Sequence, residues 1–313
     1  MDIGVVIVTY NRLEKLKTAL KSYEKQTKFP SYIIVINNAS TDGTWEFLKE
    51  WEAVVCPFEK QVLNLEKNVG GSGGFRTGLE IALEKEAEWI WVADDDAFPE
   101  YNALEIANTF LHSSLEQNIS AICGSVINQG IIDIGHRKKL YCNGLKVVTE
   151  KIDKSEYKDV FELNAFSYVG TIIKKEKILK VGLTEDKYFI WMDDTEHSLR
   201  LSKEGHIFCV PDIQVHHDVN EDTGISWKKY YLSRNTADIY RKHFSKYVYY
   251  YFCIRTILVS IIRMLSQNSR TEGKMGIEAI KDVYRGKFGM HQLYNRGGIS
   301  EDKCWNSFII ALG

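Results

Sequence analysis

The sequence predicts an α/β fold with a mostly parallel central sheet, followed by a C-terminal helical region. Apolar runs alternate with segments of helical spacing in the first part of the chain, and the pattern turns helical and basic after Trp227. Polar residues follow each of the first apolar runs, where open α/β sheets bind ligands. The length of 313 residues suits one large or two unequal domains, so we expect a sheet domain over 1–225 and a helical region over 226–313.

The individual elements follow from the spacing of apolar side chains. Apolar runs typical of strands cover residues 3–8, 32–36, 61–65 and 89–93. Helical spacing covers residues 12–26, 44–51 and 74–85. This alternation predicts parallel neighbours with helices on both faces of the sheet. Further strands are expected over 121–128, 166–175 and 207–217.

The composition limits the class of protein. A hydrophobic share of 44% is enough for a sizeable core, and a net charge of −2 argues against a nucleic-acid partner. The six cysteines form no CxxC pair, which argues against a zinc or dithiol site. The chain starts directly with an apolar run that fits a core strand better than a secretory signal, so we expect a reducing, cytoplasmic location.

Three aspartates, Asp94, Asp95 and Asp96, come directly after the fourth predicted strand. Three adjacent negative charges repel one another unless something positive lies among them. Asp94 and Asp96 stand at alternate positions and could share Mg²⁺ or Mn²⁺, which prefer oxygen ligands. The alternative is a solvated turn. The place of the triplet after a buried strand favours the metal site.

The segment NVGGSGGFRTG, residues 68–78, is rich in glycine and would let the backbone approach a ligand closely. It matches neither the dinucleotide fingerprint G-x-G-x-x-G nor a P-loop, so a nicotinamide dehydrogenase and a P-loop kinase lose support. Arg76 could contact a nucleotide or its phosphates. The alternative is a flexible turn.

Two further segments carry groups that could act in acid–base or metal chemistry. In YFIWMDDTEHSLRL, residues 188–201, the aromatic and apolar side chains before Asp194 would desolvate it and make it a better base. Glu196 and His197 are further acid–base candidates close by. The alternative is an aspartate that caps the following helix. In VHHD, residues 215–218, a histidine could add a nitrogen ligand to the aspartates, although an isolated histidine is usually structural.

The stretch YVYYYFCIRTILVSIIRML, residues 247–265, is strongly apolar but contains Arg255 and Arg263. The arginines argue against a spanning helix, which needs about 20 predominantly apolar residues. Two alternatives remain open, a helix in the membrane interface and an ordinary buried helix.

Five segments together resemble the inverting family-two glycosyltransferases of the GT-A fold. In chain order these segments are VVIVTYNR, VINNASTDGT, DDD, WMDDTEH and YYLSRN, and they extend from residue 3 to about residue 235. Asn37 departs from the pattern, because the family usually has an aspartate there. The glycine-rich segment together with DDD and WMDD is similar to bacterial galactofuranosyltransferases, and rhamnosyltransferases share much of the pattern.

The resemblance implies a role for individual residues. Asp94, Asp96 and His217 would hold Mn²⁺ or Mg²⁺ on the donor diphosphate, and Asp194 would be the general base. Asp95 and Trp191 would lie near the sugars. The residues implied to line the nucleotide or its sugar are Thr9, Asn11, Arg12, Asn38, Asn68, Arg76 and Asp95.

The implied reaction moves a sugar from a nucleotide diphosphate, with UDP-galactofuranose or another UDP-hexose first and dTDP-rhamnose second, to a hydroxyl of a polysaccharide or lipid-linked glycan. Peripheral contact with the inner face of the cell membrane is expected, and self-association stays open. Two other classes are a nucleotidyltransferase, against which the glycine-free VTYNRLEKL argues, and a non-catalytic nucleotide-sugar-binding subunit, which would have no use for Asp194.

Overall fold

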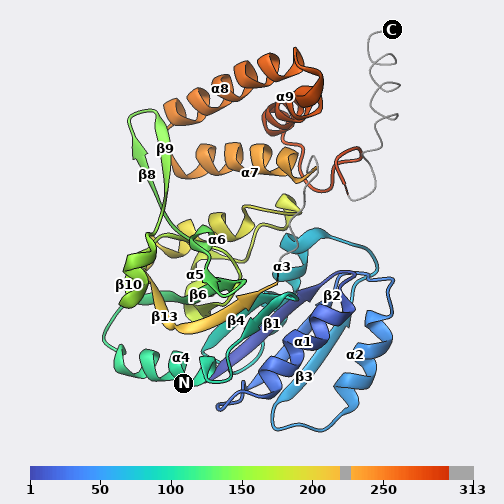
Figure 1. The fold of residues 1–313 in the computed structure, drawn as a ribbon, viewed down its shortest axis with the longest axis vertical. Coiled ribbons are helices and arrows are strands. Elements are labelled where there is room, and N and C mark those ends of the chain that lie inside the picture. The colour runs from blue at the N-terminus through green and yellow to red at the C-terminus, as the bar shows by residue number, and fades with distance from the viewer. Residues whose placement is uncertain (219–226, 296–313) are drawn as a thin grey trace. The chain divides into compact units, whose positions relative to one another are not determined.

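The computed structural model describes residues 1–218 and 227–295 and divides into two compact units (Figure 1). The first unit comprises 1–141, 148–186 and 194–220, and the second comprises 142–147, 187–193 and 221–313. The expected boundary between 225 and 226 lies outside the described residues.

The first unit is built on one large mixed sheet. Its strands, in spatial order, are β10 (Phe161–Leu163), β13 (His206–His217), β6 (Ile119–Asn128), β12 (Thr171–Lys174), β4 (Trp89–Asp94), β1 (Ile3–Thr9), β2 (Tyr32–Asn37) and β3 (Glu59–Asn64). The short strands β5 (Ala97–Pro99) and β7 (Ile131–Ile132) pair with β13 and β6. The strands β3, β2, β1 and β4 are parallel neighbours, as predicted, while β12 runs antiparallel to both β4 and β6.

Helices cover both faces of this sheet, which confirms the α/β prediction. The helices of the first unit are α1 (Leu13–Glu24), α2 (Thr44–Ala53), α3 (Gly70–Leu83), α4 (Ala103–Ser113), α5 (Lys175–Val181) and α6 (Asp193–Leu201). Alternation along β1 explains the two layers. Val5 and Ile7 join the core with α1, α2 and α4, whereas Val6 and Val8 join the core with α3, α5 and α6.

The glycine-rich segment is helical, which corrects the predicted start at residue 74. Helix α3 begins at Gly70, and its glycines let it pack closely on β1. A Cβ atom added at Gly74 would lie 2.5 Å from Val8 Cγ1, and one at Gly78 would lie 2.4 Å from Val6 Cγ1. These glycines are therefore required for the contact between helix and strand.

The predicted strand over 166–175 is two strands in two sheets. Its start belongs to β11 (Ala165–Phe166), which joins β8 (Arg137–Asn143) and β9 (Lys146–Lys151) in a three-stranded sheet, and its end is β12. The chain turns between them at Gly170, whose φ of +66° favours glycine. Four 3₁₀ helices complete the described elements: η1 (Ile134–His136), η2 (Lys154–Lys158), η3 (Asp186–Tyr188) and η4 (Gln267–Ser269).

Three long helices dominate the second unit, as the helical pattern after Trp227 predicts. They are α7 (Lys228–His243), α8 (Lys246–Met264) and α9 (Arg270–Tyr284). Helices α8 and α9 approach closely because Gly273 and Gly276 face Ser260. Among the described helices, α8 is long and apolar enough to cross a membrane, by length and composition only. Within the protein, 17% of its apolar window is buried.

Candidate active site

The aspartate triplet lies at the carboxyl end of β4, next to the carboxyl end of β1. The two strands are parallel, and Val8 stands opposite Asp94, so the residues after each strand meet at one edge of the sheet. Thr9 Oγ1 donates a hydrogen bond of 2.8 Å to Asp95 Oδ2, and Arg12 Nη1 donates one of 3.2 Å to Asp95 Oδ1. The sheet therefore brings together Thr9, Arg12 and the aspartates, as the sequence predicts.

Asp96 lies between a guanidinium and an imidazole. Arg12 Nη1 donates a 2.5 Å hydrogen bond to Asp96 Oδ2, and His217 Nε2 forms an ion pair of 3.3 Å with Asp96 Oδ1. Two buried atoms here make no hydrogen bond, Asp96 Oδ1 and His217 Nδ1. Buried polar atoms are normally satisfied, so this pair points to a missing ligand.

The three carboxylates differ in proton affinity. Loss of water around Asp94, followed by repulsion from Asp96, raises the pKa of Asp94 to about 8. Burial raises the pKa of Asp95 to about 6, although Arg12 opposes the shift. Burial acts in the same direction on Asp96, but His217 and Arg12 outweigh it and hold the pKa of Asp96 below its usual value.

Asp94, Asp96 and His217 suit a divalent cation by the chemistry of the donor set, although their ligand atoms do not gather within 4.8 Å of one another in this structure. Two carboxylates and one imidazole suit Mn²⁺ or Mg²⁺. A cation would also remove the repulsion that raises the pKa of Asp94. The neighbouring His216 is held elsewhere, since its Nε2 lies 2.5 Å from Glu100 Oε1, and this agrees with the choice of His217.

A second histidine, which was not expected from the sequence, lies beside this group. The ring of His136 packs edge-on against the ring of His217, with 5.1 Å between their centroids. His136 Nε2 lies 3.4 Å from Asp133 Oδ2, and His136 Nδ1 lies 2.6 Å from Ser167 Oγ. Both His136 and Asp133 come from the segment around η1, which has no periodicity to mark it, so only the fold reveals their place beside His217.

The predicted asparagines fix the neighbouring loops. Asn38 Nδ2 donates to Asn68 Oδ1 at 3.1 Å, and Asn38 Oδ1 accepts from the Val69 amide at 2.9 Å. Asn11 Oδ1 accepts from the amide of Thr41 at 2.7 Å. These bonds tie together the loops after β1, β2 and β3, while contact of these asparagines with a nucleotide stays a prediction.

Arg76 bonds to partners other than the aspartates. Its Nε forms a 3.1 Å ion pair with Glu80 Oε1, and its Nη1 donates to the Thr184 carbonyl at 3.3 Å. The predicted contact of Arg76 with the nucleotide stays a prediction.

Asp194 lies in the first turn of α6, where the acid–base candidates have different partners. Glu196 is paired with Arg200, whose Nε and Nη2 lie 2.9 and 2.8 Å from Glu196 Oε2. His197 Nδ1 lies 2.6 Å from the Tyr168 hydroxyl, and burial lowers the pKa of His197 to about 3. Glu196 and His197 are thus committed to the fold.

Asp194 is half-buried, and its proton affinity is raised. Desolvation raises the pKa of Asp194, while Lys138 and bonds from Thr195 limit the rise. The Thr195 hydroxyl donates to Asp194 Oδ1 at 3.2 Å and orients the carboxylate. A carboxylate with a raised pKa accepts a proton more readily near neutral pH. Its role as the base stays a prediction.

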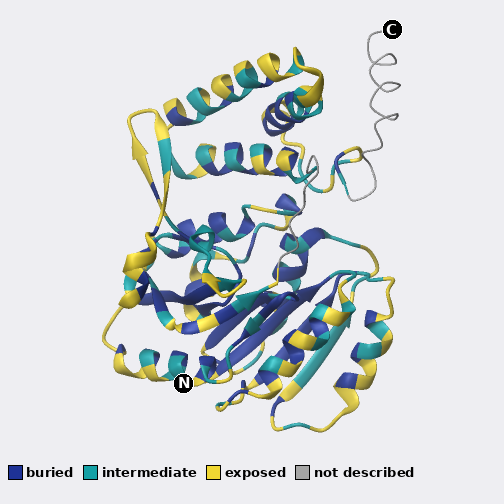
Figure 2. Cartoon of the chain, in the orientation of Figure 1, coloured by how far each residue is buried: buried dark blue, intermediate teal, exposed yellow. Residues whose placement is uncertain are grey.

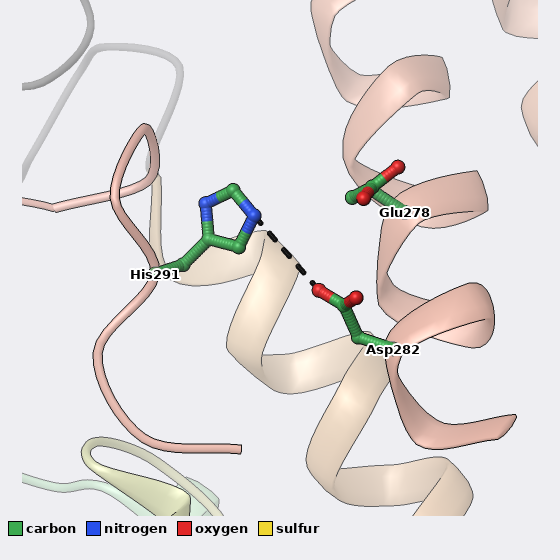
Figure 3. Close-up of side chains that lie close together, drawn as sticks. All are labelled: Glu278, Asp282 and His291. Atoms are coloured by element: carbon green, nitrogen blue, oxygen red, sulfur yellow. Dashed lines mark ion pairs between the residues drawn. The ribbon is translucent and has the colours of Figure 1, made fainter. Parts of the chain in front are cut away.

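A second group of carboxylates and histidine lies in the second unit (Figure 3). One ligand atom each of Glu278, Asp282 and His291 lies within 4.8 Å of the others. Tyr230 donates a 2.6 Å hydrogen bond to Asp282 Oδ2, and Lys281 Nζ lies 3.2 Å from Glu278 Oε2. This group was not expected from the sequence, because its residues carry no recognisable metal-binding spacing.

Comparisons with known proteins agree with this fold. Residues 4–132 match the family model described as glycosyl transferase family 2. The chain is 26% identical to the galactofuranosyltransferase GlfT1 of Mycolicibacterium smegmatis over 65% of this chain and 66% of that protein. It is 28% identical to the dTDP-rhamnosyl transferase RfbF of Shigella flexneri over 92% of this chain and 97% of that protein.

A solved structure shows the fold independently of close sequence similarity. The crystal structure of GalNAc-T7 with UDP, GalNAc and Mn²⁺ superposes with a TM-score of 0.63, at 17% identity, over 91% of this chain and 56% of that one. The GT-A fold is therefore confirmed, and it provides the parallel strands on which the aspartates and Thr9 lie. Residues 4–132 therefore carry the match to glycosyltransferase family 2, and the chain is a glycosyltransferase that uses a nucleotide-sugar donor.

Proposed function

We propose that the protein transfers galactofuranose from UDP-galactofuranose to a hydroxyl of a polysaccharide or lipid-linked glycan, with inversion at the anomeric carbon. The observation that carries the transfer chemistry is the group at the carboxyl ends of β1 and β4, where Thr9 and Arg12 bind Asp95 and Asp96. The likeness to GlfT1 supports the choice of sugar.

In this proposal Asp94, Asp96 and His217 would hold Mn²⁺ or Mg²⁺, as the two buried atoms without a hydrogen bond and the donor chemistry suggest. When bound, the cation neutralises charge on the leaving diphosphate. Thr9 and Arg12 keep the aspartates in place. The loops after β2 and β3, which Asn38 and Asn68 join by a hydrogen bond, would border the space for the nucleoside.

Asp194 accepts the proton of the acceptor hydroxyl. The oxygen of that hydroxyl forms a bond to the anomeric carbon while the bond from that carbon to the diphosphate oxygen breaks. The nucleoside diphosphate leaves with the bonding electrons, and a single displacement inverts the centre. A positioned general base of this kind contributes about 10²- to 10⁴-fold to the rate.

Reaction in the cytoplasm is part of the same proposal. The five described cysteines, Cys56, Cys123, Cys142, Cys209 and Cys253, are free thiols, as in proteins of a reducing compartment.

A second candidate donor is dTDP-rhamnose. The match to RfbF favours it, because that match extends over 92% of this chain and so includes the helical region. The two donors differ in base and sugar, and a direct comparison of both separates them.

The test is hydrolysis and thermal stabilisation with UDP-galactofuranose, UDP-galactose, UDP-glucose and dTDP-rhamnose, each with Mn²⁺ and with a chelator. We expect one donor to be hydrolysed and to stabilise the protein only with Mn²⁺. In the Asp194→Asn variant, turnover should fall about 10²- to 10⁴-fold with donor binding retained. Asp212→Asn, at an exposed position on β13, is the matched control. Near-normal turnover of Asp194→Asn would show that Asp194 is not the base.

A further inference from the structure

One face of α8 is a continuous apolar stripe. Figure 2 shows exposed positions recurring along this helix. Its exposed side chains recur every three or four residues and therefore lie on one side of the helix. Exposure reaches 67% at Ile262 and 82% at Leu265, just after the helix. The residues of this stripe are Tyr247, Tyr250, Ile254, Leu258, Ile261, Ile262 and Leu265.

The opposite face of α8 is packed inside the second unit. Val248, Cys253 and Ser260 are buried there. A Cβ atom at Gly276 would lie 2.1 Å from Ser260 Oγ, so α9 approaches α8 as closely as its glycines allow. One side of α8 is thus fixed to its neighbour while the stripe faces outward.

A groove between α8 and α9 extends the apolar surface. It has a volume of about 340 Å³, and Tyr250, Ile257, Ile280 and Tyr284 are among the residues that line it. Tyr284, at the end of α9, is 86% exposed. The surface therefore combines an aliphatic stripe with exposed tyrosines, which suit the boundary between water and hydrocarbon.

The charges of α8 are all positive. Residues 246–264 contain Lys246, Arg255 and Arg263 and no acidic residue. At 100° per residue, Lys246 and Arg255 fall on the two sides of the stripe. Arg263 lies almost opposite the stripe and forms a 3.5 Å ion pair with Glu272. Cations on both sides of an apolar face are the pattern of a helix that lies in the interface of an anionic membrane.

We propose that α8 lies flat on an anionic lipid bilayer, with the stripe among the headgroups and upper acyl chains. A spanning helix would have to bury the arginines and separate from the glycines of α9. A second copy of this chain on the stripe would bring the same cations towards one another. An anionic bilayer satisfies both the apolar and the positive groups, and this inference does not depend on which sugar is transferred.

The test is flotation of the full chain with phosphatidylcholine vesicles, with and without phosphatidylglycerol. We expect flotation with the anionic vesicles, weakened by salt, and release by alkaline carbonate. The Leu258→Glu variant should lose flotation, whereas Leu179→Glu, at a 65% exposed position on α5, should keep it. Equal flotation of wild type and Leu258→Glu would overturn the proposal, as would resistance to carbonate.

The charge component has its own variant. Arg255→Gln should bind the anionic vesicles about fivefold more weakly than wild type. Lys67→Gln, at an exposed position of the first unit, should bind them as strongly as wild type. Donor hydrolysis should be unchanged in Leu258→Glu and Arg255→Gln, which separates this inference from the transfer reaction. A dimer in solution that Leu258→Glu dissociates, without vesicle binding by the wild type, would assign the stripe to self-association and overturn the proposal.

Discussion

Each compact unit contains a group of carboxylates with a histidine, and the two groups differ in how their atoms are bonded. In the first unit, Asp96 Oδ1 and His217 Nδ1 are buried without a hydrogen bond. In the second unit, the Tyr230 hydroxyl donates to Asp282, and His291 Nδ1 accepts from two backbone amides, each at 3.2 Å. The carboxylates have internal partners in both groups, but the histidine keeps an unbonded Nδ1 in the first group and not in the second.

This difference teaches that proximity alone is a poor guide to a metal site. The Glu278 group has its ligand atoms within 4.8 Å, yet the lone pair of His291 Nδ1 is used by the Leu293 and Tyr294 amides. A neutral imidazole bonded in this way carries its proton on Nε2, which faces Asp282 Oδ2 at 3.8 Å. With Nδ1 bonded and Nε2 protonated, His291 has no lone pair left for a cation, whereas His217 keeps its Nδ1 without a hydrogen bond.

The largest expected effect comes from changing one aspartate in each group. Asp96→Asn should lower donor turnover about 10²- to 10³-fold, because it removes charge from the predicted cation site. Asp282→Asn should leave turnover within about twofold of wild type, because Asp282 bonds Tyr230 in the second unit and does not belong to the predicted cation site. Initial rates and Mn²⁺ binding by electron paramagnetic resonance would check both variants. Loss of Mn²⁺ binding in Asp282→Asn, with binding kept in Asp96→Asn, would reverse the comparison.

The next effect concerns stability. Asp282→Leu should lower the free energy of unfolding by about 1–3 kcal/mol, because the buried Tyr230 hydroxyl loses its acceptor. Urea unfolding followed by circular dichroism would measure the change. Tyr230→Phe combined with Asp282→Leu should recover part of the loss. If the double variant were no more stable than Asp282→Leu, the hydrogen bond would not be the cause.

Another histidine, His197, is fully buried, and its Nδ1 lies 2.6 Å from the Tyr168 hydroxyl. Burial, the largest cause, lowers the pKa of His197 from 6.5 to about 3 in the folded chain. The unfolded chain therefore binds the proton first as pH falls below 6.5, and stability present above that pH is lost towards pH 3. Between pH 7 and pH 5 this group should account for a loss on the order of 2 kcal/mol.

The measurement is urea unfolding of the wild type and His197→Gln at both pH values. The variant should lose less stability on acidification than the wild type, since glutamine does not titrate. Other groups, such as Asp95 with its pKa of about 6, contribute equally to both proteins and cancel in the comparison. An identical pH dependence in the two proteins would mean that His197 is not held neutral.

Much of the fold follows from local pattern. The apolar runs at 3–8 and 89–93 became β1 and β4, and their alternation placed side chains on both faces of the sheet. The low helix propensity of glycine led to a wrong prediction at residues 70–73, which are helical. The contact of α3 with Val6 and Val8 outweighs the cost of glycine in this helix.

The candidate site was predictable to the extent that strand ends mark it. Asp96 and His217 are far apart in sequence, but each stands at or just after the end of an apolar run, and the sheet brings them to 3.3 Å. The place of His136 could not be predicted, because its contact with His217 depends on an irregular segment. The Glu278 group likewise depends on how α9 and the following residues pack.

The smallest expected effect is that of Glu278→Gln. Glu278 is half-buried and paired with Lys281 one turn away, a type of pair that contributes about 0.3–0.5 kcal/mol. The variant should therefore unfold within about 0.5 kcal/mol of wild type, and Mn²⁺ should raise the melting temperature of both proteins equally. A smaller Mn²⁺ effect in Glu278→Gln than in wild type would show that the second unit binds the cation too, and the difference between the two groups would then be one of affinity.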